Sequence, residues 1–172
     1  VGVRDVRYPV QIRSAQGVQP SVGTFEMTVA LPPEVKGTHM SRFIEMLEAH
    51  PDALDAQQLG VLLQHMLVRL QASEGAITAR FTYFARKTAP VSGVESLMDY
   101  EVTLRAEQKA GVTTLTQKVQ VPVTSLCPCS KEISNYGAHN QRSHVTIGAT
   151  LRGDLGLDEQ IRIAETAASC EL

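Results

Sequence analysis

This sequence of 172 residues has a small net charge, few cysteines and no long apolar runs. The formal net charge is −2, so the chain lacks the basic excess that binding to a phosphate backbone usually requires, and no nucleic-acid partner is expected. The apolar runs are far too short to span a bilayer, so no membrane role is expected. The 43% hydrophobic and 20% charged residues are typical of a soluble globular protein.

The chain has only three cysteines, an odd number, and Cys127 and Cys129 are separated by a single residue. This spacing is poor geometry for a disulfide between the two thiols. A reducing compartment is the simpler interpretation, so we expect a cytoplasmic protein. The N-terminal residues carry no signal or transit pattern.

Several catalytic signatures are also absent. There is no His-Glu-x-x-His zinc motif, no Gly-x-Gly-x-x-Gly after a strand and no phosphate-binding Gly-x-x-x-x-Gly-Lys-Ser/Thr loop. The zinc deaminase pattern fails as well, because its cysteines are separated by two residues and follow the His-x-Glu element.

Alternation of apolar and polar residues predicts six strands. In the first, Val6, Tyr8, Val10 and Ile12 alternate with polar residues and a proline. The others are expected over residues 24–31, 77–86, 100–107, 115–123 and 145–151. Because each has one polar face, we expect an antiparallel sheet.

Three stretches follow the helical period instead. The first helix is expected to begin near Thr38 or Ser41, acting as N-cap, and to end at Pro51. Asp55 is expected to cap a second helix with a leucine stripe, and Asp158 a third.

The predicted order is strand, strand, helix, helix, three strands, a polar motif, strand and helix, which indicates an α+β fold. Two helices would pack on one face of the sheet. We predict a first unit over residues 1–124, then an active-site loop and the beginning of a second unit over residues 125–172. The final helix would have little to pack against, so we expect the chain to be incomplete or completed by partner subunits.

The stretch from 123 to 144 concentrates the reactive side chains. Cys127, Cys129 and His139 supply thiolate and imidazole, the commonest protein ligands of a borderline-soft divalent metal. Because the chain has no Cys-x-x-Cys pair in addition to Cys127 and Cys129, the pattern favours an open catalytic metal site over a closed structural one.

Two other interpretations of this stretch stay open. The cysteines could be small buried apolar residues, with His139 capping a turn. Either cysteine could instead be a nucleophile with a lowered pKa, helped by Lys131, Arg142 or a helix N-terminus.

A second stretch, Lys36 to Arg42, lies at the start of the first predicted helix. Backbone N–H groups and the helix dipole favour anions there, which predicts a phosphate site. A turn followed by a cap, with Lys36 and Arg42 in solvent, explains the same residues equally well. His50 and His65 are expected to be surface residues without a role.

Two segments, Lys-Gly-Thr-His-Met-Ser-Arg-Phe at 36–43 and Leu-Cys-Pro-Cys-Ser-Lys-Glu-Ile-Ser-Asn-Tyr-Gly-Ala-His-Asn-Gln-Arg-Ser at 126–143, closely resemble the type IB GTP cyclohydrolases of prokaryotes. The resemblance implies a tunnelling (T-) fold, whose unit is an antiparallel sheet in the order strand, strand, helix, helix, strand, strand. It also implies two such units per subunit and a homotetramer with active sites at its interfaces.

The implied reaction converts GTP and water to 7,8-dihydroneopterin triphosphate and formate, the entry step to tetrahydrofolate. By the resemblance, Cys127 and His139 are metal ligands, and Cys129 is a further ligand or a catalytic thiol. His39 is a candidate for substrate contact or proton transfer. By charge alone, the triphosphate partners are expected to be Lys36, Arg42, Lys131 and Arg142. Thiolate and imidazole suit zinc, the expected metal, or iron, and an added carboxylate would admit manganese.

Family members continue beyond the position of Leu172, where a glutamate ligand, the acid that anchors guanine and further histidines are expected. A chain ending at Leu172 would have no cyclohydrolase activity. Two competing functions are considered: a T-fold reductase that acts on a deazaguanine nitrile with a cysteine nucleophile and NADPH, and a non-catalytic interaction module stabilised by a metal.

Overall fold

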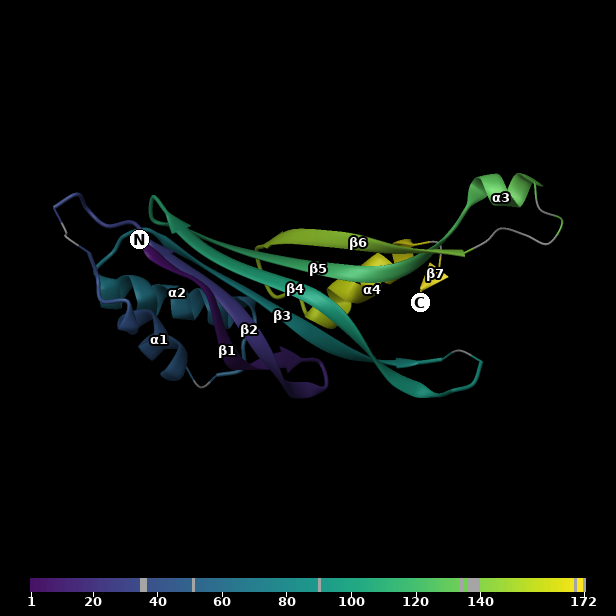
Figure 1. Ribbon diagram of the computed structural model, residues 1–172, viewed down its shortest axis with the longest axis horizontal. Helices are drawn as coiled ribbons and strands as arrows, with labels where there is room; N and C mark the ends of the chain where they lie inside the picture. Colours follow the sequence, from purple (N-terminus) through teal and green to yellow (C-terminus); the bar gives the residue numbers. More distant parts are fainter. Residues whose placement is uncertain are drawn as a thin grey trace.

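Figure 1 shows the computed structural model, which describes residues 1–34, 37–50, 52–89, 91–133, 135, 140–168 and 170–171. Its strands are β1 (Gly2–Ser14), β2 (Gly17–Val29), β3 (Gly75–Thr88), β4 (Glu95–Lys109), β5 (Val112–Leu126), β6 (Asn140–Leu151) and β7 (Cys170–Glu171). Its helices are α1 (Ser41–Glu48), α2 (Ala56–Leu70), α3 (Pro128–Ile133) and α4 (Leu157–Ala167).

The strands form one antiparallel sheet in the order β1-β2-β3-β4-β5-β6, and β7 pairs with β5. The predicted α+β class and the order strand, strand, helix, helix, strand, strand are confirmed. A two-residue turn at Ala110 and Gly111 joins β4 to β5, and both residues have the positive φ angles that such a turn favours. Because β5 pairs with both β4 and β6, the predicted units 1–124 and 125–172 share one continuous sheet.

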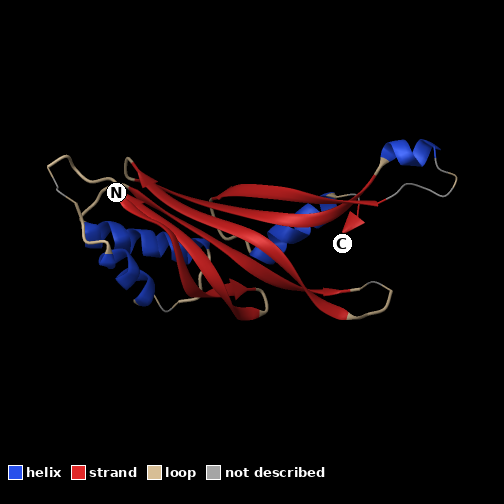
Figure 2. Ribbon diagram, in the orientation of Figure 1, coloured by secondary structure: helices blue, strands red, loops and turns tan. Residues whose placement is uncertain are grey.

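Strand alternation divides the sheet into two chemically different faces. On the face covered by the helices, Phe25 and Met27 of β2 pack with Ile77 of β3 and with Leu63 and Met66 of α2 in one core. Figure 2 shows that no helix covers the other face of the sheet within the described ranges, which carries the polar member of each alternating pair. This uncovered side is called the open face below.

The helix ends agree only in part with the capping predictions. Asp55 caps α2, because its carboxylate accepts a hydrogen bond from the backbone N–H of Gln58 at 2.8 Å. The predicted caps of α1 are wrong: Met40 occupies the N-cap position, and no side chain caps the helix. Asp158 does not cap α4 either; Gly156 does, and Asp158 lies in the first turn of that helix.

The sheet forks where β4 and β5 separate. These strands pair only between Glu101–Lys109 and Val112–Gln120. Beyond that point β4 stays paired with β3. Strand β5 stays paired with β6 and also pairs with β7. Helix α4 lies beneath the fork (Figure 1), where Leu157, Ile161 and Ala164 join the main core. The expectation that this helix has little to pack against is therefore wrong.

Buried polar contacts hold α4 against β3 and β4. The carboxylate of Glu165 accepts a hydrogen bond from the Tyr100 hydroxyl at 2.9 Å and pairs with the Lys87 ammonium at 2.5 Å. In the first turn of the same helix, Asp158 accepts a hydrogen bond from the Tyr83 hydroxyl at 2.8 Å. Burial first, and then the hydrogen bond to Glu165, raises the pKa of Tyr100, so its phenol stays protonated as the donor.

Candidate functional site

The thiol pair lies where β5 leaves the sheet. Strand β5 ends at Leu126, Cys127 follows, and the short helix α3 begins at Pro128. Cys127 is half-buried and Cys129 is exposed, and both are free thiols. Figure 2 shows α3 projecting beyond the sheet, so these cysteines are not core residues. The interpretation of the two cysteines as buried apolar residues is wrong.

The surroundings of Cys127 favour its thiolate. A hydrogen bond from the Ser130 side chain, followed by one from the Ser130 backbone, lowers the pKa of the Cys127 thiol. Burial acts in the opposite direction and is the weaker influence. The thiolate is the form that binds metals and attacks electrophiles, so Cys127 is prepared for either role.

Sequence reasoning missed both α3 and the role of Ser130. The signal was present, because proline is favoured at the first position of a helix, and Pro128 is the first residue of α3. A helix beginning at Pro128 directs the backbone and side chain of Ser130 toward Cys127.

The metal site predicted at this loop involves His139, which lies outside the described residues. Within the described residues, no group of three or more His, Cys, Asp or Glu side chains is arranged to hold a metal ion. The donors that are described, the thiolate-prone Cys127 and the exposed Cys129, fit a soft or borderline metal by their chemistry.

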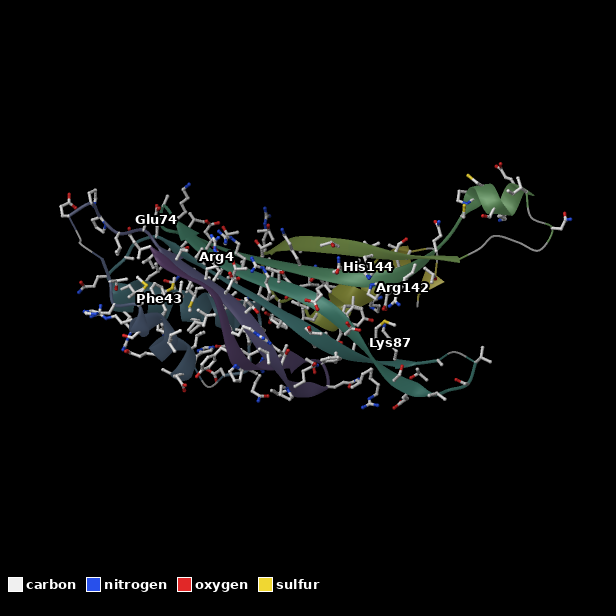
Figure 3. All side chains as sticks on the ribbon, viewed as in Figure 1. Arg4, Phe43, Glu74, Lys87, Arg142 and His144 are labelled. Atoms are coloured by element: carbon white, nitrogen blue, oxygen red, sulfur yellow. The ribbon has the colours of Figure 1, made fainter. Side chains whose placement is uncertain are left out.

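Two cations predicted to contact phosphate lie near this loop. Lys131 is exposed on α3. Arg142 lies on β6, which begins at Asn140 rather than at the predicted position 145, and it pairs in register with Thr124 of β5. Figure 3 shows Arg142 and His144 on this strand. Strand β5, which leads to Cys127, therefore lies beside β6, which carries the exposed Arg142.

The residues of the other predicted site lie far from the thiols. Lys36 is outside the described residues, His39 is exposed, and Arg42 is half-buried in the first turn of α1. Figure 1 shows α1 and α3 toward opposite ends of the long axis of the molecule. Strands of 13 to 15 residues separate them, and at about 3.3 Å per residue each spans more than 40 Å. A single chain therefore does not bring His39 and Cys127 together.

Both His50 and His65 were predicted to be surface residues. His65 is exposed as predicted, but His50 is not. His50 is half-buried after α1, and its Nε2 atom is buried without a hydrogen-bond partner among the described residues. Burial lowers the pKa of His50; Asp52 and Asp55 oppose this effect, and His65 adds to it.

Lowering the pH from 7 to 5 is therefore expected to lower the midpoint of thermal unfolding through His50. The folded-state pKa lies below the ordinary value of 6.5, so this contribution is complete above pH 6.5 and is lost as the pH falls toward the folded-state pKa. Circular dichroism melts across this range should show a smaller pH dependence for His50→Gln. His144→Gln is the control, because His144 is exposed on β6 and is not among the groups that act on His50. Equal slopes for His50→Gln and the unmodified protein would contradict the prediction.

Comparison with known proteins adds independent evidence. A family model described as "Type I GTP cyclohydrolase folE2" matches residues 1–172. This chain belongs to that FolE2 family. GTP cyclohydrolase FolE2 of Herminiimonas arsenicoxydans is 59% identical over 172 residues, which cover 100% of this chain and 66% of the relative. The protein of the same name from Cupriavidus pinatubonensis is 58% identical, with 100% and 64% covered.

The chain thus spans slightly less than two thirds of the length of these FolE2 relatives. The match includes both segments that carry the sequence resemblance, and therefore the loop with Cys127 and Cys129. In the described part of this FolE2 chain, no helix is long and apolar enough to cross a membrane.

Proposed function

We propose that the protein is a cytoplasmic GTP cyclohydrolase of type IB, which converts GTP and water to 7,8-dihydroneopterin triphosphate and formate in folate biosynthesis. The observation that carries the proposal is the FolE2 family match over residues 1–172, which includes the thiol loop. The lowered pKa of the Cys127 thiol supports it, because a reactive thiolate is what a metal site requires there.

The proposed metal site is built on Cys127 and His139, with Cys129 as a further ligand or catalytic thiol. Zinc is the expected metal, and iron or manganese would depend on the remaining ligand. A metal held there would supply Lewis-acid activation of the water that attacks the C8 carbon of guanine. Ser130 would keep the Cys127 sulfur ionised and oriented through its hydrogen bonds.

Phosphate recognition is assigned to the exposed cations around the loop. Lys131 on α3 and Arg142 on β6 would contact the triphosphate, and an arginine can hold two phosphate oxygens at once. Both side chains are solvated, so their contribution should depend on ionic strength.

Lys36, His39 and Arg42 would complete the site from a second chain. Their distance from α3 within one chain supports a homo-oligomer, in which the α1 end of one subunit approaches the thiol loop of another. A tetramer with active sites at interfaces fits this division of the residues.

Incubation of the full-length protein with GTP and zinc, manganese or ferrous iron should release formate. It should also release a pterin that fluoresces after oxidation. Arg142→Ala is expected to raise the KM for GTP about tenfold, because one charge-assisted contact to phosphate contributes about 1.5 kcal/mol. Lys118→Ala, on the open face of β5 and remote from the loop, is the matched control. Absence of formate with all three metals would refute the proposal.

One observation favours a second candidate, the reductase that attacks a deazaguanine nitrile through a cysteine and uses NADPH. A thiol with a lowered pKa serves as a nucleophile as well as a ligand. This enzyme would remain active after chelation and would consume NADPH only when the nitrile is present. The cyclohydrolase should do neither.

A further inference from the structure

A groove crosses the open face between β1 and β4, away from the thiol loop. It has a volume of about 800 Å³, and its lining includes Arg7, Val22, Arg80, Phe84 and Glu101. The groove exists because the ladder between β2 and β3 ends at Thr24 and Arg80, beyond which the two strands separate.

Side chains, rather than a backbone ladder, connect β2 and β3 beyond this point. The Ser21 hydroxyl donates a hydrogen bond to the carbonyl oxygen of Thr82 at 2.9 Å. The side chain of Gln19 bonds to both the N–H and the carbonyl oxygen of Phe84, each at 3.0 Å. These contacts tie β2 to β3 across the groove, so the groove is largely formed in advance of binding.

Two arginines face the groove from one cross-strand row. Arg7 pairs in register with Thr24, and Thr24 pairs with Arg80, so the three side chains lie on the same face. Two strand spacings separate the backbones of Arg7 and Arg80 by about 10 Å. Arginine side chains are long enough to converge over Thr24 on one bound anion.

Acidic side chains neutralise the positive charge of these arginines only in part. Arg80 lies 3.7 Å from Glu26, and that carboxylate also pairs with Arg4 at 3.3 Å. In the part of the chain that the structure describes, no acidic partner pairs with Arg7. Arg4 and Arg80 thus share one carboxylate, and Arg7 pairs with none among the described residues, which leaves positive charge at the β1 end of the groove.

The remainder of the groove has different chemistry. Phe84 is 41% exposed and Val22 is 49% exposed, so an aromatic and an aliphatic side chain are open to solvent beside the arginines. Glu101 lies at the β4 wall, where its carboxylate accepts a hydrogen bond from Thr82 at 3.0 Å. An anion is therefore favoured near Arg7, and an uncharged ring near Phe84.

We infer that this groove binds a small phosphorylated aromatic compound, such as a nucleotide, with its phosphate on Arg7 and Arg80 and its ring against Phe84. The site is separate from the thiol loop of the same chain. Arg80 and Lys118 flank Thr103 in one row of the sheet. Cys127 follows the end of β5, nine residues after Lys118 and about 30 Å from it. The inference is independent of the proposed cyclohydrolase reaction.

Calorimetric titration of the full chain with AMP tests this site, because AMP lacks the guanine that the proposed active site would recognise. Arg7→Ala and Arg80→Ala should each weaken AMP binding at least fivefold. Lys118→Ala, which removes one exposed cation of the same face outside the groove, should change it less than twofold. Cys127→Ala should leave AMP binding unchanged, which separates this site from the thiol loop.

Inorganic phosphate and a Phe84→Ala variant test the aromatic part. AMP should bind more tightly than phosphate, and Phe84→Ala should reduce that advantage at least threefold. Circular dichroism melts would verify that each variant is folded. The inference is overturned if AMP does not bind at millimolar concentration, if the arginine variants bind it as well as Lys118→Ala does, or if Cys127→Ala abolishes binding.

Discussion

Cys127→Ala is expected to reduce formate release from GTP by the full-length protein about 1000-fold or more. The proposed metal would lose a ligand, and metal activation of water supplies several kcal/mol of transition-state stabilisation, each 1.4 kcal/mol of which is tenfold in rate. The free energy of unfolding should change by less than about 1 kcal/mol, because Cys127 lies on a projecting segment outside the core. Formate assay, metal content and urea unfolding measure the three effects.

Ser130→Ala is the companion variant. It removes the side-chain hydrogen bond that most strongly lowers the pKa of Cys127, so the pH at which the enzyme becomes active should shift upward. A Cys127→Ala protein that keeps its metal and turnover would refute the ligand role. One that loses several kcal/mol of stability would instead favour the metal-stabilised interaction module.

Glu165→Ala is expected to lower the free energy of unfolding by about 3 kcal/mol. The substitution leaves the ammonium of Lys87 and the buried hydroxyl of Tyr100 without their shared partner, and breaking a buried pair typically costs 3–5 kcal/mol. The lower end of that range applies because the Lys87 side chain is still 28% exposed to water. Urea unfolding followed by circular dichroism measures the change.

Glu165→Gln separates charge from hydrogen bonding. The amide keeps an acceptor for Tyr100 but removes the charge that pairs with Lys87, so its loss should be smaller than that of Glu165→Ala. Glu95→Ala, which breaks the exposed pair with Arg86 on the same hairpin, should change stability by less than about 1 kcal/mol. Equal losses of unfolding free energy for Glu95→Ala and Glu165→Ala would show that the contacts of Glu165 stabilise the fold no more than an exposed ion pair does.

Local patterns predicted most of the scaffold. Residues such as Phe25 and Met27 alternate with polar neighbours, and this period identified the strands because successive side chains point to opposite faces. Asp55 was identified as a cap because its carboxylate can satisfy a free N–H within its own helix turn. Asp158 looked the same in sequence, yet its carboxylate bonds to Tyr83, a partner 75 residues away.

The sequence by itself therefore determined the elements, the α+β class and the reactive loop around Cys127, because periodicity, capping and motif chemistry act over a few neighbouring residues. Tertiary structure decided the fork between β4 and β5, the burial of Glu165 beneath it and the separation of His39 from Cys127. It also placed Arg7 and Arg80 together across three strands, since that juxtaposition depends on register. The register and twist of the strands depend on interactions summed over the whole sheet, so no short segment of sequence encodes them.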